Sequence, residues 1–196
     1  ELDRPTWGGS IRLRRLWAGP LQVLPGEAVC LKFEWRAGLA PGAAYLLDLK
    51  LVDDQGVIWA ERRSEPCGGW CPSETWTSGQ LQLDRHALHV PPGTPPGDYR
   101  VQVAWLPAGG GLPLPVERSG ERLTETTVAT VTVLHAAVPV EPELVPNPLS
   151  ASFGNEVTLL GYRLPVEARP GETIQIETHW RAQVAPAQDY ELQVEL

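Results

Sequence analysis

Apolar residues recur at every second position through most of this chain, and this period of two constrains the fold more than any other feature. In residues 28–35, Val29, Leu31, Phe33 and Trp35 alternate with Ala, Cys, Lys and Glu. Successive side chains of a β-strand point to opposite faces of its sheet, whereas a helix repeats every 3.6 residues. No stretch has a convincing helical period. We therefore predict an all-β protein.

The alternating segments are short, and turn signals separate them. They number about seven within the first 137 residues: 11–17, 28–35, 45–51, 57–60, 81–90, 98–105 and 127–133. Asp53-Asp54-Gln55-Gly56 predicts a hairpin turn rather than a calcium loop. The 20 Pro and 19 Gly are spread along the chain, as expected for many strands joined by tight turns. This pattern fits an antiparallel, two-sheet sandwich of the immunoglobulin/fibronectin-like type.

Two segments predict local detail. Between residues 80 and 90 the apolar positions change parity, from Leu81 and Leu83 to Leu88 and Val90, which predicts a β-bulge or bend. The stretch Pro-Pro-Gly-Asp-Tyr, ending at Tyr99, enters a strand. It predicts either a tyrosine corner, with the hydroxyl bonded to nearby backbone, or a plain core aromatic.

The chain also repeats its own opening. Residues 170–196 align without a gap with residues 25–51 and share Pro-Gly-Glu, Trp-Arg-Ala, Ala-Pro, a Tyr and two Leu. Core positions stay apolar, as where Leu31 becomes Ile176, and surface positions stay polar. Only Phe33, which aligns with Thr178, breaks the inward pattern. We infer a tandem repeat.

The repeat divides the chain into three parts. Residues 1–137 are expected to form a complete β-sandwich unit, and residues 138–150, with four Pro in thirteen positions, a semi-rigid linker. Residues 151–196 supply the first strands of a second, incomplete unit. We expect either that the native chain continues past Leu196 or that these strands complete a sheet elsewhere, in the same chain or in another copy.

These residues resemble a known group of repeats. The order FGNEVTLLGYRLP, RPGETIQIETHWRA and DYELQVEL is similar to the start of β-sandwich repeats in large bacterial surface and membrane proteins. Such repeats often form the extracytoplasmic tails of dolichyl-phosphate-mannose–mannosyltransferase-like glycosyltransferases, particularly in filamentous thermophiles. The resemblance covers most of residues 9–106 and 153–196. It implies a fold rather than an activity, because its motifs are turn and core residues.

Charge and motif content exclude several classes of function. The formal net charge is −8, and we see no basic stripe in the sequence, so we expect neither nucleic acid nor an anionic membrane surface as partner. No run of about 18 apolar residues is present, so we expect no membrane insertion by this segment. No phosphate loop, nucleophile elbow or zinc motif appears, and we predict no cofactor, no metal and no enzymatic activity.

The sharpest local motif is Cys67-Gly68-Gly69-Trp70-Cys71. Two cysteines at this spacing can close a small disulfide loop, because the glycines let the backbone turn. A disulfide would place the protein in an oxidising, extracytoplasmic compartment. Reduced thiols, or metal or redox chemistry, are the alternatives. Cys30, on the polar face of its strand, is expected to be a free thiol.

Histidines and tryptophans outside the core pattern are the other candidates. His86 and His89 point to opposite sides of a strand, so we predict surface histidines rather than a metal site. Trp70 and Trp76 lie in the irregular stretch 63–80. An exposed indole there could stack on a sugar ring as the ligand contact of a carbohydrate-binding module. The alternative is that Trp70 caps an end of the sandwich and shields its loop.

Together these observations predict a non-catalytic, extracytoplasmic module of a larger bacterial surface or membrane protein, which acts as a spacer, adhesion or assembly domain. Its expected partners are neighbouring repeats or other protein chains, with self-association through the incomplete second unit. A glycan is the alternative partner.

Overall fold

The computed structural model describes residues 4–118, 120–136, 145–165, 167–169, 171, 174–184 and 190–194. The chain divides into two compact units, Glu1–Ala137 and Val138–Leu196, which we describe separately. Regular structure in both units is almost entirely β-strand, and the prediction of an all-β protein is confirmed. No helix among the described residues has the length and apolar character needed to cross a bilayer.

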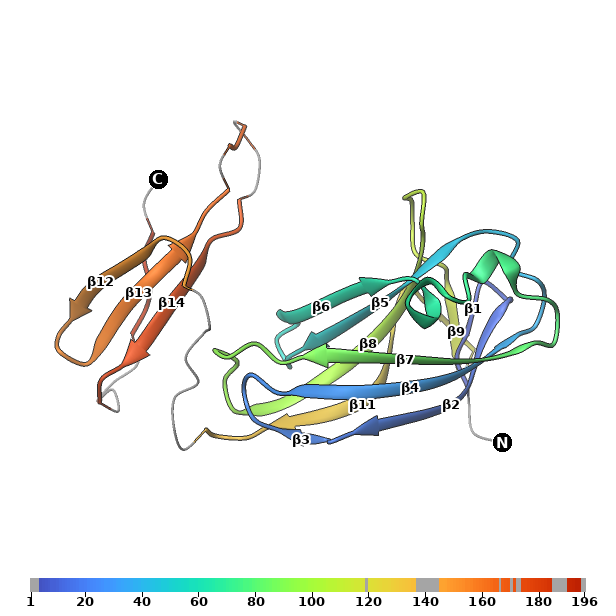
Figure 1. Ribbon diagram of the computed structural model, residues 1–196, viewed down its shortest axis with the longest axis horizontal. Helices are drawn as coiled ribbons and strands as arrows, with labels where there is room; N and C mark the ends of the chain where they lie inside the picture. The colour runs from blue at the N-terminus through green and yellow to red at the C-terminus, as the bar shows by residue number, and fades with distance from the viewer. Residues whose placement is uncertain are drawn as a thin grey trace. The chain divides into compact units, whose positions relative to one another are not determined.

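Unit 1 consists of two sheets in a sandwich-like arrangement (Figure 1). The first has six strands, in the spatial order β10 (Glu121–Leu123), β9 (Val116–Arg118), β1 (Thr6–Trp7), β2 (Ile11–Gly19), β4 (Ala28–Ala37) and β7 (Leu81–His89). The second has five strands, in the order β3 (Gln22–Val23), β11 (Thr126–Val133), β8 (Gly97–Pro107), β5 (Tyr45–Val52) and β6 (Ile58–Ser64).

Among the described residues, all strand pairs are antiparallel except one. β3 runs parallel to β11 at the edge of the second sheet, where the Thr132 N–H donates to the Leu21 carbonyl and the Leu134 N–H donates to the Val23 carbonyl, both at 2.8 Å. The second sheet is therefore mixed, which differs from the purely antiparallel sheets that we predict from the sequence.

The core between the two sheets is centred on aromatic rings. Trp35 of β4 stacks on Phe33 at 4.8 Å between ring centroids and meets Trp7 edge-on at 5.6 Å. Across the gap, Trp105 of β8 contacts Trp35 edge-on at 5.2 Å. All four side chains are fully buried. The inward positions that the alternation predicts on β4, β5 and β8 are confirmed, because each sheet buries these side chains against the other.

Strand β7 does not have the bulge that the sequence predicts. Its register with β4 is continuous, from Ala28 opposite His89 to Arg36 opposite Leu81. The parity change has another cause: the inward face of the strand carries Asp84 and His86 as well as Leu88, whereas Leu83 is exposed. Because these two inward positions are polar, the apolar alternation is interrupted, and the sequence has the same pattern as a strand with a bulge.

Tyr99 combines the two interpretations of its segment. Its ring is buried, and its hydroxyl donates to the Pro95 carbonyl at 2.8 Å. The tyrosine-corner bond is therefore present on a residue that also belongs to the core.

The turn after β5 forms the predicted hairpin, and Asp53 organises it. One carboxylate oxygen accepts from the backbone N–H groups of Gln55 (3.0 Å) and Val57 (2.8 Å), and the other accepts from Trp59 Nε1 (2.9 Å). These bonds, that from Trp59 first, hold the pKa of Asp53 below its ordinary value of 3.8. Both carboxylate oxygens of Asp53 therefore accept hydrogen bonds within the hairpin itself.

The described residues of unit 2 form one three-stranded sheet: β12 (Pro148–Phe153), β13 (Val157–Arg163) and β14 (Glu177–Ala182). Strand β12 begins inside the predicted linker, so the expected linker end at residue 150 is wrong. Residues 138–144 of that linker lie outside the described residues. Pro at the first residue of an edge strand costs no ladder hydrogen bond, which lets the strand begin there.

Unit 2 has the same strand register as part of unit 1. Val157 lies opposite Ala182 as Ile11 lies opposite Ala37, and both pairings shift by one residue at the same place, after Leu159 and after Leu13. The turn before each middle strand is also alike: it contains Gly8-Gly9 in unit 1 and Gly154-Asn155 in unit 2, all at positive φ.

The aromatic pairs that flank these turns correspond as well. Phe153 packs against Trp180 at 5.5 Å between ring centroids, as Trp7 packs against Trp35. The pair in unit 2 is exposed, 52% for Phe153 and 39% for Trp180, whereas the pair in unit 1 is fully buried. The difference follows from the second sheet of unit 1, which covers that face.

Replacing Asp53 by Asn tests the hairpin. Asn keeps one acceptor but loses the carboxylate oxygen that Trp59 Nε1 uses. The pKa of Asp53 is lower in the folded protein than in the unfolded chain, where it is about 4. Above the unfolded-state pKa, the ionised carboxylate therefore stabilises the fold. This stabilisation is lost as the pH falls through the folded-state pKa. We expect the difference in unfolding free energy between wild type and Asp53→Asn to shrink as pH falls from about 5 to about 2. Urea denaturation followed by tryptophan fluorescence measures it, and a difference independent of pH would contradict this account.

Candidate functional site

The cysteine loop leaves the second sheet after β6. It is closed by the predicted disulfide between Cys67 and Cys71, whose Cα atoms are 5.5 Å apart. Two 3₁₀ turns, η1 (Pro66–Gly69) and η2 (Ser73–Thr75), shape the loop. Cys67 (φ 54°), Gly68 (61°) and Gly69 (92°) occupy the left-handed region that favours glycine. The Gly pair therefore lets the chain turn back within five residues.

A buried carboxylate connects this loop to the core. Asp84 Oδ1 accepts from the Cys67 N–H at 2.8 Å, and Oδ2 accepts from Trp35 Nε1 at 3.2 Å. His86 Nε2 lies 2.7 Å from Asp84 Oδ1, and its Nδ1 lies 3.1 Å from the Ser64 hydroxyl. Asp84 is fully buried and His86 is 5% exposed. The prediction that His86 lies on the surface is therefore wrong, because Asp84 and Ser64 give the imidazole polar partners inside the protein; His89 is exposed, as predicted.

Trp76 belongs to the core, and it cannot be the ligand contact that the sequence analysis suggests. The indole is 1% exposed, meets Trp105 edge-on at 5.9 Å, and donates from Nε1 to the Cys71 carbonyl at 2.8 Å. It ties the disulfide loop to the second sheet. The surrounding residues are irregular in sequence, so no alternation marks position 76 as an inward one.

Trp70 is placed in the opposite way. Its side chain is 92% exposed at the tip of the loop. The alternative that it caps the sandwich and shields the loop is therefore wrong. A large apolar ring held in water by a cross-linked turn is available for stacking on a ligand.

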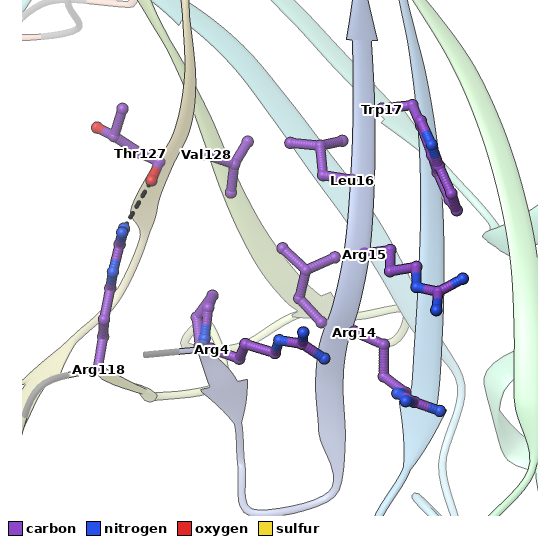
Figure 2. A pocket seen from close by; sticks show the side chains of 10 residues that line it. Arg4, Arg14, Arg15, Leu16, Trp17, Arg118, Thr127 and Val128 are labelled. Carbon is purple, nitrogen blue, oxygen red and sulfur yellow. Dashed lines mark hydrogen bonds between the residues drawn. The ribbon is translucent and has the colours of Figure 1, made fainter. Parts of the chain in front are cut away.

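A second feature is an open groove between the two sheets, where β2 and β11 lie at unpaired edges. Among the described residues, β1 pairs with β2 only up to Arg12, and β3 pairs with β11 only at Thr132 and Val133. The groove has a volume of about 540 Å³. Leu13, Leu16 and Val128 provide its apolar lining, and Figure 2 shows the side chains of Leu16 and Val128 pointing toward one another.

Four arginines surround this space, which we call the arginine groove: Arg4, Arg14, Arg15 and Arg118. Arg118 donates to the Thr126 hydroxyl (3.0 Å) and the Thr127 carbonyl (2.8 Å). Glu34 is the carboxylate nearest Arg14 and Arg15, at 3.9 and 4.0 Å. In the part of the chain that the structure describes, Arg4 has no carboxylate within salt-bridge distance.

Two further arginines extend the positive surface. Arg12 and Arg36 line an adjoining pocket together with Arg4 and Arg14, and they are direct cross-strand partners on β2 and β4. Like charges directly opposite each other destabilise a sheet. Neither has an ion pair among the residues that the structure describes. A bound anion would relieve this repulsion.

The premise that the chain lacks a basic surface is therefore wrong at this place. Arg12, Arg14 and Arg15 are close in sequence, but Arg4, Arg36 and Arg118 reach the same surface only through strand pairing. The shift of register after Leu13 also changes which way the following side chains point. The run Arg-Leu-Arg-Arg-Leu-Trp was the signal available in the sequence.

The two features offer two kinds of ligand contact. Guanidinium groups recognise carboxylates, sulfates or phosphates through paired N–H donors. The exposed Trp70 ring offers a stacking surface. Within the described ranges, no three His, Cys, Asp or Glu side chains gather as they would around a metal ion. Cys30 is exposed and unpaired.

Comparison with known proteins adds no identity. No protein-family model matches the chain, and no curated protein sequence matches it.

The two loop tryptophans should respond differently to truncation. Trp76→Ala removes a fully packed indole and is expected to lower the free energy of unfolding by about 3–5 kcal/mol. Trp70→Ala removes a side chain in water and should change it by less than about 0.5 kcal/mol. Thermal and urea denaturation of the two variants measure the contrast. Equal effects would contradict the placement of Trp76 in the core.

Proposed function

We propose that the protein is a non-catalytic, extracytoplasmic module of tandem immunoglobulin/fibronectin-like β-sandwiches, which acts as a spacer, adhesion or assembly domain of a larger bacterial surface or membrane protein. The observation that carries the proposal is the shared register of β1–β2–β4 and β12–β13–β14, including the shift at the same residue. A second unit built on the same plan is what a series of sandwiches requires.

The location rests on the cysteines. Disulfides persist in oxidising compartments and are rare in the cytosol of mesophiles. The Cys67–Cys71 bond closes a loop whose first N–H, that of Cys67, donates to Asp84 and whose last carbonyl, that of Cys71, accepts from the buried indole of Trp76. This arrangement favours a stable structural bond over a redox-active one, which requires an accessible, low-pKa thiolate.

The free thiol of Cys30 tests the location. In spheroplasts of the source organism, with the cytoplasmic membrane intact, a membrane-impermeant maleimide should label Cys30, because this residue is exposed. Cys67 and Cys71 should be labelled only after a reductant is added. Mass spectrometry of the labelled peptides identifies the sites, and a Cys30→Ser variant is the control. Labelling of Cys30 only after cell lysis would overturn the proposed location.

The second candidate is a carbohydrate-binding module, and the 92% exposure of Trp70 favours it. Trp76 takes no part in this version. An exposed indole on a cross-linked loop can stack on a sugar ring at little entropic cost, because its backbone is already ordered.

On a glycan array, this candidate predicts binding that Trp70→Ala reduces by tenfold or more, corresponding to about 1.4 kcal/mol. The variant should keep the wild-type melting temperature. Trp17→Ala, which removes another exposed indole away from the cysteine loop, is the matched control. Absence of any glycan signal, or equal loss in both variants, would leave the spacer role as the proposed function.

A further inference from the structure

Unit 2 shows how the outer edge of the strand that corresponds to β2 is covered, and this indicates what the arginine groove can hold. In unit 2, residues 145–149 lie along the outer edge of β13. The Tyr162 N–H donates to the Pro146 carbonyl at 3.1 Å, and the Asn147 side-chain amide donates to the Tyr162 carbonyl at 3.1 Å. An extended, proline-containing segment thus covers this edge.

Leu16 is the residue of unit 1 that corresponds to Tyr162. Leu16 lies opposite Phe33 as Tyr162 lies opposite Thr178, at the same distance from the shift in register. In an antiparallel pair, N–H and C=O groups point alternately toward the partner and away from it. The backbone N–H and C=O of Leu16 therefore point outward into the groove, and no described residue pairs with them.

The charge of the groove is particular to unit 1. At the corresponding positions unit 2 has Ser150 for Arg4, Leu160 for Arg14 and Gly161 for Arg15. At Gly161 the covering segment comes so close that a Cβ would lie 3.0 Å from the Asn147 carbonyl and closer still to Pro146. Unit 1 has Arg15 at this point, so a segment that pairs with β2 has to pass farther from the strand here than in unit 2. A carboxylate on that segment can meet the Arg15 guanidinium in the space between them.

We propose that the outer edge of β2 is a strand-addition site for an extended acidic segment of another polypeptide chain. The backbone of the incoming segment pairs with the outward N–H and C=O of Leu16. Its apolar side chains lie on Leu13, Leu16 and Val128. Its carboxylates meet Arg4 and Arg15, which form no bidentate pair with any described carboxylate.

A polypeptide fits this site better than other polyanions. An unpaired strand edge offers alternating donors and acceptors at the spacing of a peptide backbone. Neither a glycan nor a nucleic acid provides that spacing. The apolar lining between the arginines also suits the alternating side chains of a strand. The inference goes beyond the spacer role and does not depend on where the protein is located.

The test uses a labelled peptide and the full 196-residue chain. The probe is Leu-Val-Pro-Asn-Glu-Glu with an N-terminal fluorescein and an amidated C-terminus. It copies residues 144–147 of the chain, of which 145–147 cover β13, and it has glutamates in place of Pro148 and Leu149, where that segment passes Gly161. The matched control peptide has Gln in place of both Glu. Fluorescence anisotropy measures binding, and amide hydrogen exchange by NMR measures pairing.

We expect the acidic peptide to bind at least about tenfold more tightly than the Gln peptide, and to bind more weakly as salt is raised, because its charged contacts are screened. The double variant Arg4→Gln, Arg15→Gln should lose about tenfold in affinity. A second double variant, Arg85→Gln, Arg122→Gln, removes the same charge elsewhere and should bind like wild type. Exchange of the Leu16 amide should slow by about tenfold or more, whereas that of the Trp17 amide, directed toward β4, should not change.

Several outcomes would overturn the proposal. One is equal binding of the two peptides, or no binding at about 1 mM. Another is peptide binding without slower exchange of the Leu16 amide. A further one is tighter binding of polygalacturonate than of the peptide. Either result would mean that the groove binds polyanions in general rather than a pairing strand. The last is a Leu16 amide already protected in the free protein, which would mean that the chain's own residues occupy the edge.

Discussion

The buried carboxylate of Asp84 is the interaction on which the rest of unit 1 depends. It accepts hydrogen bonds from Trp35, at the centre of the aromatic core, and from the backbone of Cys67, at the start of the disulfide loop. An ionisable group without water must have such partners, because an unpaired one costs several kcal/mol. The core and the disulfide loop therefore fix each other's positions, and either one would be less defined alone.

Most strands could be predicted from the sequence, because the alternation of apolar and polar residues shows which face of a strand is buried. The prediction failed where polar residues were buried or where no alternation existed. Asp84 and His86 point inward on a regular strand, since each is the other's partner, and a single sequence shows no pairing between side chains. Trp76 follows a loop, so its direction is set by a disulfide and a turn that only the fold reveals.

The arginine groove shows a different limit of the sequence. Its guanidinium groups come from the segment before β1, from β2 and β4, and from the end of β9. These segments are up to about a hundred residues apart in the sequence. Local charge patterns miss such a gathering, particularly in a chain whose net charge is negative. Even the short run of arginines on β2 was ambiguous, because the shift after Leu13 changes which side chains face solvent together. The segment that covers β13 in unit 2 indicates what kind of chain can lie along the corresponding edge of β2 in unit 1.

The parallel pairing of β3 with β11 has a mechanical consequence. β3 follows β2 near the start of unit 1, and β11 is its last strand. Tension on the two ends of the unit therefore pulls β3 and β11 in opposite directions along their own axes. The bonds from Thr132 and Leu134 are then sheared together rather than broken one after another. Geometry of this kind resists stretching until both bonds fail at once. A unit held in this way bears force along its length better than it resists being peeled from one side.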